Sequence, residues 1–140
     1  MPAEKYIHKV NYYETDKMGI THHSNYIRFM EEARMNYLSE TGFTMSRLEA
    51  EGIASPVVSL TCDYKCPTTY DDEIEIEVKL TQYTGVKISL AYVMKNLKTG
   101  AVVAEASSDH CFIDRAGRPV AVKKAIPEMD GVLKSIMQEA

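Results

Sequence analysis

The chain has 140 residues, of which 45% are hydrophobic and 26% charged, and a formal net charge of -4 at pH 7. These values are typical of one globular domain with a single core, expected to span residues 1–140, and they exclude a disordered or fibrous chain. No stretch approaches the roughly 20 apolar residues that cross a bilayer, and the first residues lack the apolar run of a signal peptide, so we expect a cytoplasmic protein without a membrane span.

The N-terminal third predicts a strand, a turn-rich segment and a long helix. The strand is expected at Tyr6–Tyr12, and apolar residues at three- and four-residue spacing after Ser24 predict an amphipathic helix of about four turns that ends near Gly42. Ser24 suits the N-cap, because its hydroxyl can accept a hydrogen bond from a free backbone N–H of the first turn. Gly42 suits the residue in left-handed conformation that ends a helix. The predicted buried stripe of this helix comprises Tyr26, Ile27, Met30, Ala33, Arg34, Tyr37 and Leu38.

The remainder of the chain predicts a short helix, four strands and a final helix. Ser46 and Glu49 fit a capping box for a helix that ends near Gly52. Strands follow at 57–64, 73–81, 87–95 and 102–114, and helical spacing returns at 127–137. Strands that are neighbours in the sequence are expected to pair antiparallel. Helices and strands are segregated, which favours an α+β domain with the long helix across one face of the sheet.

Asp16 and His23 are the main candidates for chemistry, because they lie in the segment that leads into the long helix. The start of a helix carries free N–H groups and the positive end of the helix dipole. The run Asp16-Lys17-Met18-Gly19 also suits a type I turn, so spacing alone leaves a structural role for Asp16 open. The histidines interpreted as structural are His8, His22 and His110.

No metal or cofactor is expected from the motifs. The three cysteines are an odd number without secretory context, so reduced thiols are expected in place of disulfides. Cys62-x3-Cys66 is not the closely spaced double pair of a typical zinc site, and buried structural cysteines explain these residues as well. The sequence contains no Gly-rich phosphate loop, Gly-x-Ser-x-Gly elbow or dinucleotide fingerprint.

Charge is distributed unevenly along the chain. Residues 86–126 carry seven basic and three acidic side chains, whereas residues 1–85 carry eight basic and 14 acidic ones. The basic segment is interpreted either as a solvated face of scattered lysines or as a contact for the phosphates of a small anionic ligand. Nucleic acid is not expected, because no dense basic stripe is interleaved with aromatic residues. The candidates for phosphate contacts are Arg115, Arg118, Lys123 and Lys124.

Residues 13–34 resemble the signature of hotdog-fold acyl-CoA thioesterases of the 4-hydroxybenzoyl-CoA thioesterase family, especially the branch similar to Tol-Pal-associated thioesterases. The matching positions are Thr15, Asp16, Gly19, His23, Asn25, Tyr26, Phe29, Glu32, Ala33, Arg34 and Gly42. The order of elements agrees over essentially the whole chain, whereas the specific motif covers its first third. The resemblance implies a hotdog fold, in which an antiparallel sheet wraps a central helix and subunits pair edge to edge as a homodimer or homotetramer.

By this resemblance the chain hydrolyses an acyl-CoA thioester to a carboxylic acid and free CoA. Asp16 is then the nucleophile or the general base, the backbone N–H of His23 polarises the thioester oxygen, and Ser24 and Asn25 contact the substrate. Relatives usually carry Val-Val-Tyr-His where this chain has Ile20-Thr21-His22-His23, a difference that affects the polarity of the acyl pocket. The alternatives are a hotdog acyl carrier protein thioesterase, a hydratase, for which the usual Pro-Gly-containing segment is absent from the sequence, or a non-catalytic acyl-CoA-binding module.

Overall fold

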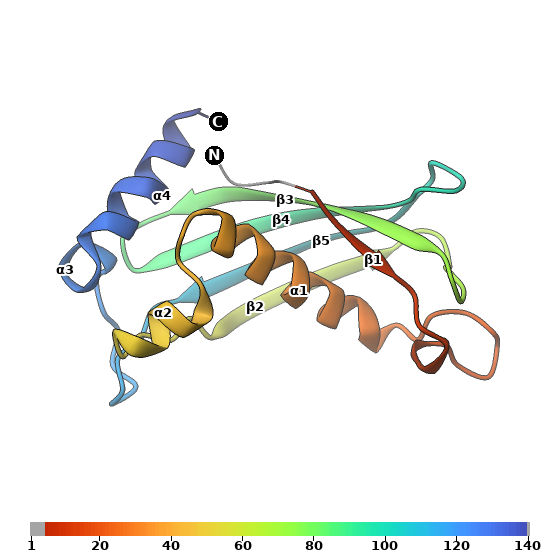
Figure 1. Cartoon of the computed structure of the whole chain (residues 1–140), viewed down its shortest axis with the longest axis horizontal. Coiled ribbons are helices and arrows are strands. Elements are labelled where there is room, and N and C mark those ends of the chain that lie inside the picture. The colour runs from red at the N-terminus through yellow and green to blue at the C-terminus, as the bar shows by residue number, and fades with distance from the viewer. Residues whose placement is uncertain (1–4, 140) are drawn as a thin grey trace.

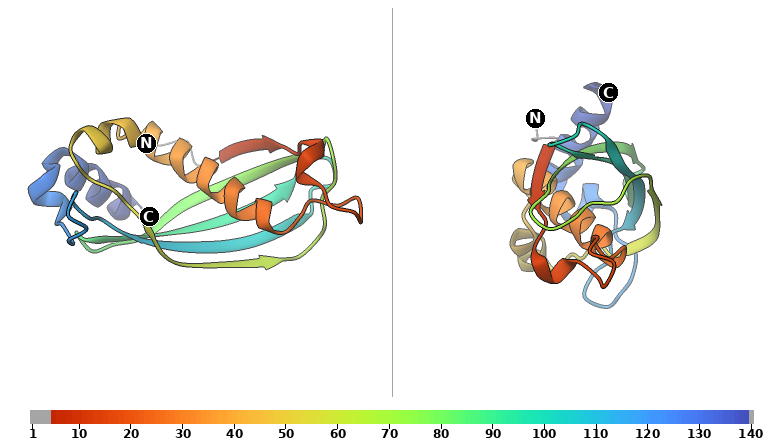
Figure 2. Two further views of the ribbon diagram at one scale, coloured as in Figure 1. Left: turned by 90° about the horizontal axis from the view of Figure 1, so that it is seen from below. Right: turned by 90° about the vertical axis from the view of Figure 1, so that its right-hand side faces the viewer.

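A five-stranded antiparallel sheet curves around the long helix α1 (Ser24–Glu40), as Figures 1 and 2 show. The computed structural model describes residues 5–139. The strands are β1 (Lys5–Lys9), β2 (Val57–Tyr64), β3 (Glu73–Tyr83), β4 (Lys87–Asn96) and β5 (Val102–Cys111). The shorter elements are the 3-10 turn η1 (Tyr12–Glu14) and the helices α2 (Met45–Ala50), α3 (Val122–Ala125) and α4 (Pro127–Glu139). The predicted α+β class, with the sheet wrapped around the long helix, is confirmed.

The strand order is β1-β3-β4-β5-β2, with every pair antiparallel. The predicted pairing of β3 with β4 and of β4 with β5 is confirmed. The expectation that β2 pairs with β3 is wrong, because the connection at 65–72 carries the chain across the molecule and leaves β2 at the far edge beside β5. Strand β2 therefore has one strand neighbour within residues 5–139, and its other edge is open.

The core lies between the concave face of the sheet and α1. The alternating residues of β3, from Ile74 to Leu80, point their apolar side chains to this face, and Phe29 and Ala33 of α1 pack against the same core. Ile27 was predicted to be buried but is 45% exposed, whereas Phe29, outside the predicted stripe, is fully buried. The buried face of α1 is thus turned toward β3 and β1, and the Ile27 side of the helix faces the open edge at β2.

The ends of several elements differ from the predictions. Ser24 is the first residue of α1 and not its N-cap, which is His23. Helix α2 is capped by the Thr44 hydroxyl, which accepts from the N–H of Arg47, so the predicted capping box with Ser46 is wrong. Gly42 does end α1 in the left-handed region, at φ +92°.

Strand β1 stops at Lys9 because the next residues form the 3-10 turn η1. Asn11 N–H donates to the Glu14 carboxylate at 2.7 Å, which closes that turn. At the other end of the chain, β5 ends at Cys111, earlier than predicted, and the short helix α3 was not predicted. Within residues 5–139, no helix is both long and apolar enough to cross a membrane.

Candidate active site

Asp16 opens a tight turn between η1 and α1. Gly19 N–H donates to the Asp16 carbonyl at 3.0 Å, and Asp16 N–H donates to the Ile20 carbonyl at 2.8 Å. Gly19 has φ +82°, a conformation that costs glycine little and strains other residues. The predicted turn from Asp16 to Gly19 is therefore present, and it fixes the backbone that carries the half-buried Asp16 carboxylate.

The Asp16 carboxylate is only partly engaged by its own turn. Its Oδ1 accepts the Met18 N–H at 2.8 Å, and within residues 5–139 no hydrogen bond or ion pair reaches its other oxygen. Asp114 makes a similar turn in the loop after β5, but its Oδ1 accepts two backbone N–H groups, from Ala116 at 2.9 Å and Arg118 at 3.0 Å. The aspartate turn thus occurs twice, and within residues 5–139 each of the two carboxylates has one oxygen without a partner. What favours Asp16 is that it lines a cavity together with His23.

The start of α1 provides one free backbone donor. The N–H groups of Asn25 and Tyr26 donate to the carbonyls of His22 and His23 at 3.0 and 3.2 Å, and Ser24 N–H donates to His22 Nδ1 at 3.2 Å. Within residues 5–139, no acceptor is bonded to the N–H of His23. The helix start therefore leaves the His23 N–H available, at the end of the helix that carries partial positive charge.

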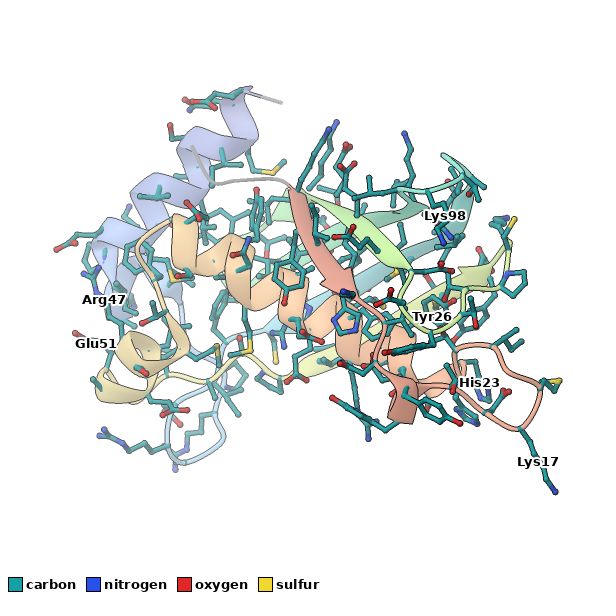
Figure 3. The ribbon with its side chains drawn as sticks, turned by 45° about the vertical axis from the view of Figure 1, so that its right-hand side comes forward. Lys17, His23, Tyr26, Arg47, Glu51 and Lys98 are labelled. Carbon is teal, nitrogen blue, oxygen red and sulfur yellow. The ribbon has the colours of Figure 1, made fainter. Side chains whose placement is uncertain are left out.

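Asp16 and His23 line the same cavity, which has a volume of about 340 Å³. Figure 3 shows His23 and Tyr26 at the start of α1, behind the loop whose tip carries Lys17. The remaining lining residues are Met18, Ile20, Thr21, Tyr26, Tyr64, Lys65, Cys66 and Pro67. The cavity is thus built from the turn before α1, the first turn of α1 and the segment that leaves β2.

The far wall of the cavity is aromatic, and sequence reasoning missed most of it. Tyr64 at the end of β2 lies edge-on to Tyr26, with ring centroids 5.2 Å apart, and its hydroxyl donates to the His23 carbonyl at 3.1 Å. Burial raises the pKa of Tyr64 to about 12, and burial also raises the pKa of Tyr26. Both phenols are therefore neutral at pH 7 and act as donors without adding negative charge beside Asp16.

The segment after β2 also holds the Asp16 turn in place. Thr21 N–H donates to the Thr68 carbonyl at 2.8 Å, and the hydroxyls of Thr68 and Thr21 are 2.7 Å apart. The Thr69 hydroxyl donates to the Gly19 carbonyl at 2.7 Å. Since β2 lies far from the first helix in sequence, local patterns carry no signal for these contacts.

A buried polar network supports the turn from the other side. The Glu14 carboxylate contacts His8 Nε2 at 2.8 Å, and the Glu14 carbonyl accepts from His22 N–H and from the Asn25 side-chain amide, both at 2.8 Å. The other end of the Asn25 amide accepts from Arg28 at 3.0 Å. Buried Asn25 is therefore occupied in joining α1 to the turn.

The predicted substrate contacts do not all meet at this cavity. Ser24 and Asn25 are absent from its lining, and the Ser24 hydroxyl lies 2.9 Å from His22 Nδ1. The exposed residues Arg115, Arg118, Lys123 and Lys124, here called the distal basic set, lie on the loop after β5 and on α3. That loop pairs with the segment between α2 and β2, since Ala54 pairs with Ile113, and it lies at the opposite end of the molecule from the Asp16 turn (Figure 1). A single chain does not bring the distal basic set to Asp16.

Cysteines and histidines do not assemble a metal site in the part of the chain that is described. Cys62, Cys66 and Cys111 are free thiols, and Cys66 lines the Asp16 cavity. Within residues 5–139, no group of three His, Cys, Asp or Glu side chains is placed to hold a metal ion. His8 and His110 are buried and hydrogen-bonded, whereas His22 is exposed and bonded to Ser24.

Sequence comparison relates the chain to known proteins over most of its length. A model of the thioesterase-like superfamily matches residues 10–136. A "putative esterase" of Aquifex aeolicus is 35% identical over 124 residues, which is 89% of this chain and 94% of the relative. The "putative acyl-CoA thioesterase YneP" of Bacillus subtilis is 34% identical over 121 residues, which is 86% of this chain and 87% of the relative.

The backbone of the chain is also similar to those of solved structures. The DHNA-CoA thioesterase of Staphylococcus aureus has a TM-score of 0.93 against this chain at 26% identity, and the match covers 96% of this chain and 91% of that one. The similarity therefore includes the sheet, the central helix and the segment that holds Asp16.

Proposed function

This chain belongs to the thioesterase-like superfamily of hotdog-fold thioester hydrolases, and we propose that it hydrolyses acyl-CoA thioesters with Asp16 as its catalytic carboxylate. The proposal is supported most directly by one observation: Asp16, which has an oxygen without a partner, and His23, which has a free N–H, line the same cavity of about 340 Å³. The substrate class follows the names of the relatives, and the residue roles follow the site.

Asp16 acts on the thioester carbonyl carbon, directly as nucleophile or as the base that takes a proton from water. In the second route the hydroxide forms the new C–O bond, the C–S bond breaks, and the proton held by Asp16 passes to the CoA sulfur. In the first route a carboxylate oxygen of Asp16 forms the new C–O bond and the C–S bond breaks, which releases the CoA thiolate. Water then hydrolyses the acyl-aspartate, which restores the carboxylate, releases the carboxylic acid and supplies the proton that the thiolate takes up. A carboxylate with one oxygen fixed by Met18 N–H and the other free is oriented for either role.

The His23 N–H stabilises the oxygen on which negative charge develops. A backbone donor at a helix start is preorganised, and removing one such donor costs roughly 100-fold to 1,000-fold in rate in other hydrolases. The hydroxyl of Tyr64 donates to the His23 carbonyl, which belongs to the next peptide unit, so it helps to fix the backbone of His23. Asn25 contributes by position, because its amide ties α1 to Glu14.

The active enzyme is a homo-oligomer whose subunits pair along β2. This strand has an open edge, and Val57 and Val58 on it are about half exposed, as are Ile27 and Met35 on α1 to a lesser degree. An unpaired edge with apolar side chains is a template for another strand. Pairing about a two-fold axis is isologous, so β2 of one subunit meets β2 of the other.

Antiparallel pairing of two β2 strands would also bring the distal basic set of one subunit close to the Asp16 cavity of the other. The loop that carries Arg115 pairs with Ala54, just before β2 begins, whereas Tyr64 at the end of β2 lines the Asp16 cavity. Antiparallel β2 strands place the start of one beside the end of the other. The CoA phosphates of a substrate bound at one Asp16 then contact the distal basic set of the second subunit.

The experiment that tests Asp16 compares Asp16→Asn with Asp114→Asn. Both replace an aspartate whose Oδ1 accepts a backbone N–H two residues on, and both amides are nearly isosteric with the acid. We expect Asp16→Asn to lower kcat by roughly 100-fold to 10,000-fold, the usual contribution of a catalytic acid or base, while Asp114→Asn keeps kcat close to that of wild type. Release of free thiol from a panel of acyl-CoA and acyl carrier protein thioesters gives the rates, and circular dichroism checks the fold.

Near-normal turnover by folded Asp16→Asn removes Asp16 from the mechanism. Hydrolysis of none of the panel would favour a binding module. A preference for acyl carrier protein thioesters would change the assigned substrate class and would leave the proposed role of Asp16 unchanged.

A further inference from the structure

A second, much smaller cavity lies beside α1 and shares no lining residue with the Asp16 cavity. Its volume is about 30 Å³, and it is lined by residues of α1, β2, β4 and β5 and is open to the surface on one side. Its buried polar residues are Arg34, Tyr92, Ser108 and His110. The proposed hydrolysis uses none of these four residues.

Arg34 is a buried cation without an anion. It is only 8% exposed, and within residues 5–139 no carboxylate lies within 4.0 Å of its guanidinium. Its Nη1 faces the carbonyl of Ser55 at 3.5 Å and Nδ1 of His110 at 3.3 Å, and the described residues form no hydrogen bond to its other two nitrogens. A guanidinium carries five N–H donors, and burying a charge without an ion partner is costly.

The groups hydrogen-bonded to Arg34 carry no negative charge. Because His110 Nδ1 faces an Arg34 N–H, it accepts, so the ring proton is on Nε2 and is donated to the Ser108 hydroxyl at 2.7 Å. Burial, and then the charge of Arg34, lower the pKa of His110 to about 4, which keeps the ring neutral. The ring therefore does not add a second positive charge.

Counting hydroxyl hydrogens leaves one donor unused. Ser108 already accepts from His110, and it shares a single hydrogen bond of 2.8 Å with the Tyr92 hydroxyl. That bond uses one of the two hydroxyl hydrogens, and within residues 5–139 no acceptor is bonded to the other. Both Ser108 and Tyr92 line the cavity, so the unused O–H and the unused N–H groups of Arg34 lie around one small space.

We propose that this cavity binds a small monovalent inorganic anion of halide size, with Arg34 as its charged partner and the free hydroxyl of Ser108 or Tyr92 as its second donor. The volume of about 30 Å³ exceeds the 10–15 Å³ or so that one water-sized particle requires, so it accommodates a single small ion. Ile27, Val57 and Leu60 line the outer side of the cavity, and such apolar contacts suit a weakly hydrated ion. The bound anion joins α1 to β5 by completing the partners of Arg34.

A water molecule or a carboxylate from a second copy of the chain could accept hydrogen bonds from the same donors, and the experiment below distinguishes both from an anion. A water molecule accepts hydrogen bonds but leaves the charge of Arg34 uncompensated. A carboxylate from a second copy paired along β2 would supply the charge, since Val57 and Leu60 belong to that strand. Glu31, three residues before Arg34, lines the cavity as well but makes no ion pair with it.

The first measurement uses wild-type protein crystallised in sodium bromide. We expect an anomalous bromide peak in the cavity, between the Arg34 guanidinium and the hydroxyls of Ser108 and Tyr92. The second is denaturant unfolding in sodium bromide against sodium fluoride at equal ionic strength. Bromide should stabilise the wild type more than fluoride does, although general salt effects run the other way because strongly hydrated anions are excluded from protein surfaces.

The matched variants are Arg34→Met and Arg28→Met, which remove a buried and an exposed arginine from the same helix. Arg28→Met should keep the bromide dependence of stability. Arg34→Met should weaken the apparent bromide affinity about tenfold or more, which is the usual effect of losing a hydrogen bond to a charged group.

Three results would overturn the proposal: a cavity without bromide in the wild-type crystal, a carboxylate of a second copy against Arg34 in that crystal, or the same bromide dependence in wild type and Arg34→Met. If Arg34→Met fails to fold, the crystal and the wild-type comparison of bromide with fluoride still decide, because neither depends on a variant.

Discussion

Acidification should destabilise this protein through His110 before its carboxylates are protonated. The ring is 1% exposed and donates to Ser108, while its other nitrogen faces the Arg34 guanidinium. Burial and Arg34 lower its pKa to about 4, and the opposing effects of the Ser55 backbone and the Asp109 carboxylate are smaller. Glu31 and Tyr92 are the other ionisable side chains that line the same cavity. Protonating His110 in the native state would place a second cation against Arg34.

The sign and size of the effect follow from proton linkage. The unfolded chain binds a proton at His110 below pH 6.5, whereas the folded chain binds it only below about pH 4. The contribution of His110 to the free energy of unfolding is therefore fully present above pH 6.5 and is lost as the pH drops from 6.5 toward 4. Below about pH 4 this residue causes no further change. Between pH 7 and pH 5 the loss is about 2 kcal/mol, and the full loss is at most about 3 kcal/mol.

Urea unfolding of wild type and His110→Asn at pH 7 and pH 5, in halide-free buffer, measures this loss. The variant is less stable at both values but lacks the titrating ring, so its stability should fall by about 2 kcal/mol less than that of wild type over this interval. The imidazole resonances of His110 in folded wild type give the pKa independently. Equal losses in the two proteins, or a His110 resonance that titrates near pH 6.5, would refute the reasoning.

Three further predictions concern the proposed site. His23→Ala should lower kcat less than Asp16→Asn does, because the backbone N–H remains; a larger loss in the folded variant would assign the ring a chemical role. Neutralising the distal basic set should raise KM for a CoA thioester more than for a truncated pantetheine thioester, and added salt should mimic the effect; equal losses on both esters would exclude phosphate binding by the set. Val58→Lys places a charge on the edge strand and should lower the dimer fraction in sedimentation and the activity together; a fully active monomer would show that the site is complete in one chain.

Local patterns in the sequence predicted the elements that pack by alternation or helical periodicity. Strands β3 and β4 show period-two apolar residues such as Ile74 and Leu90, and α1 shows helical spacing, so their type followed directly. The ends of elements were less predictable, because caps depend on which donor a particular loop satisfies. Thr44 caps α2 although Ser46 and Glu49 also fit a capping box.

Long-range placement was the part that the sequence did not reveal. Strand β2 has weak alternation, and its position beside β5 depends on where the segment at 65–72 crosses. The same crossing brings Tyr64 and Thr68 to the Asp16 turn, so the wall of the cavity was missed together with the strand order. Asp16 and His23 stay predictions, which came from their place before a long helix and from the resemblance to hotdog-fold thioesterases.

Hydrogen-bonding capacity that remains unused separates the candidate functional residues from the structural ones better than residue type does. Asn25 matches the family motif, yet both ends of its amide are engaged, so it holds the turn in place. Asp114 makes the same turn as Asp16, and within residues 5–139 it too has one carboxylate oxygen without a partner, so a free oxygen has to be combined with a place at a cavity. Asp16 keeps a free oxygen and His23 a free N–H at one cavity, and Arg34 keeps free donors at another. Because a buried or half-buried polar group without a partner is costly, such groups mark places where a ligand can bind. This criterion supports the two proposed sites, whereas the choice of a thioester for the larger cavity follows the names of the relatives.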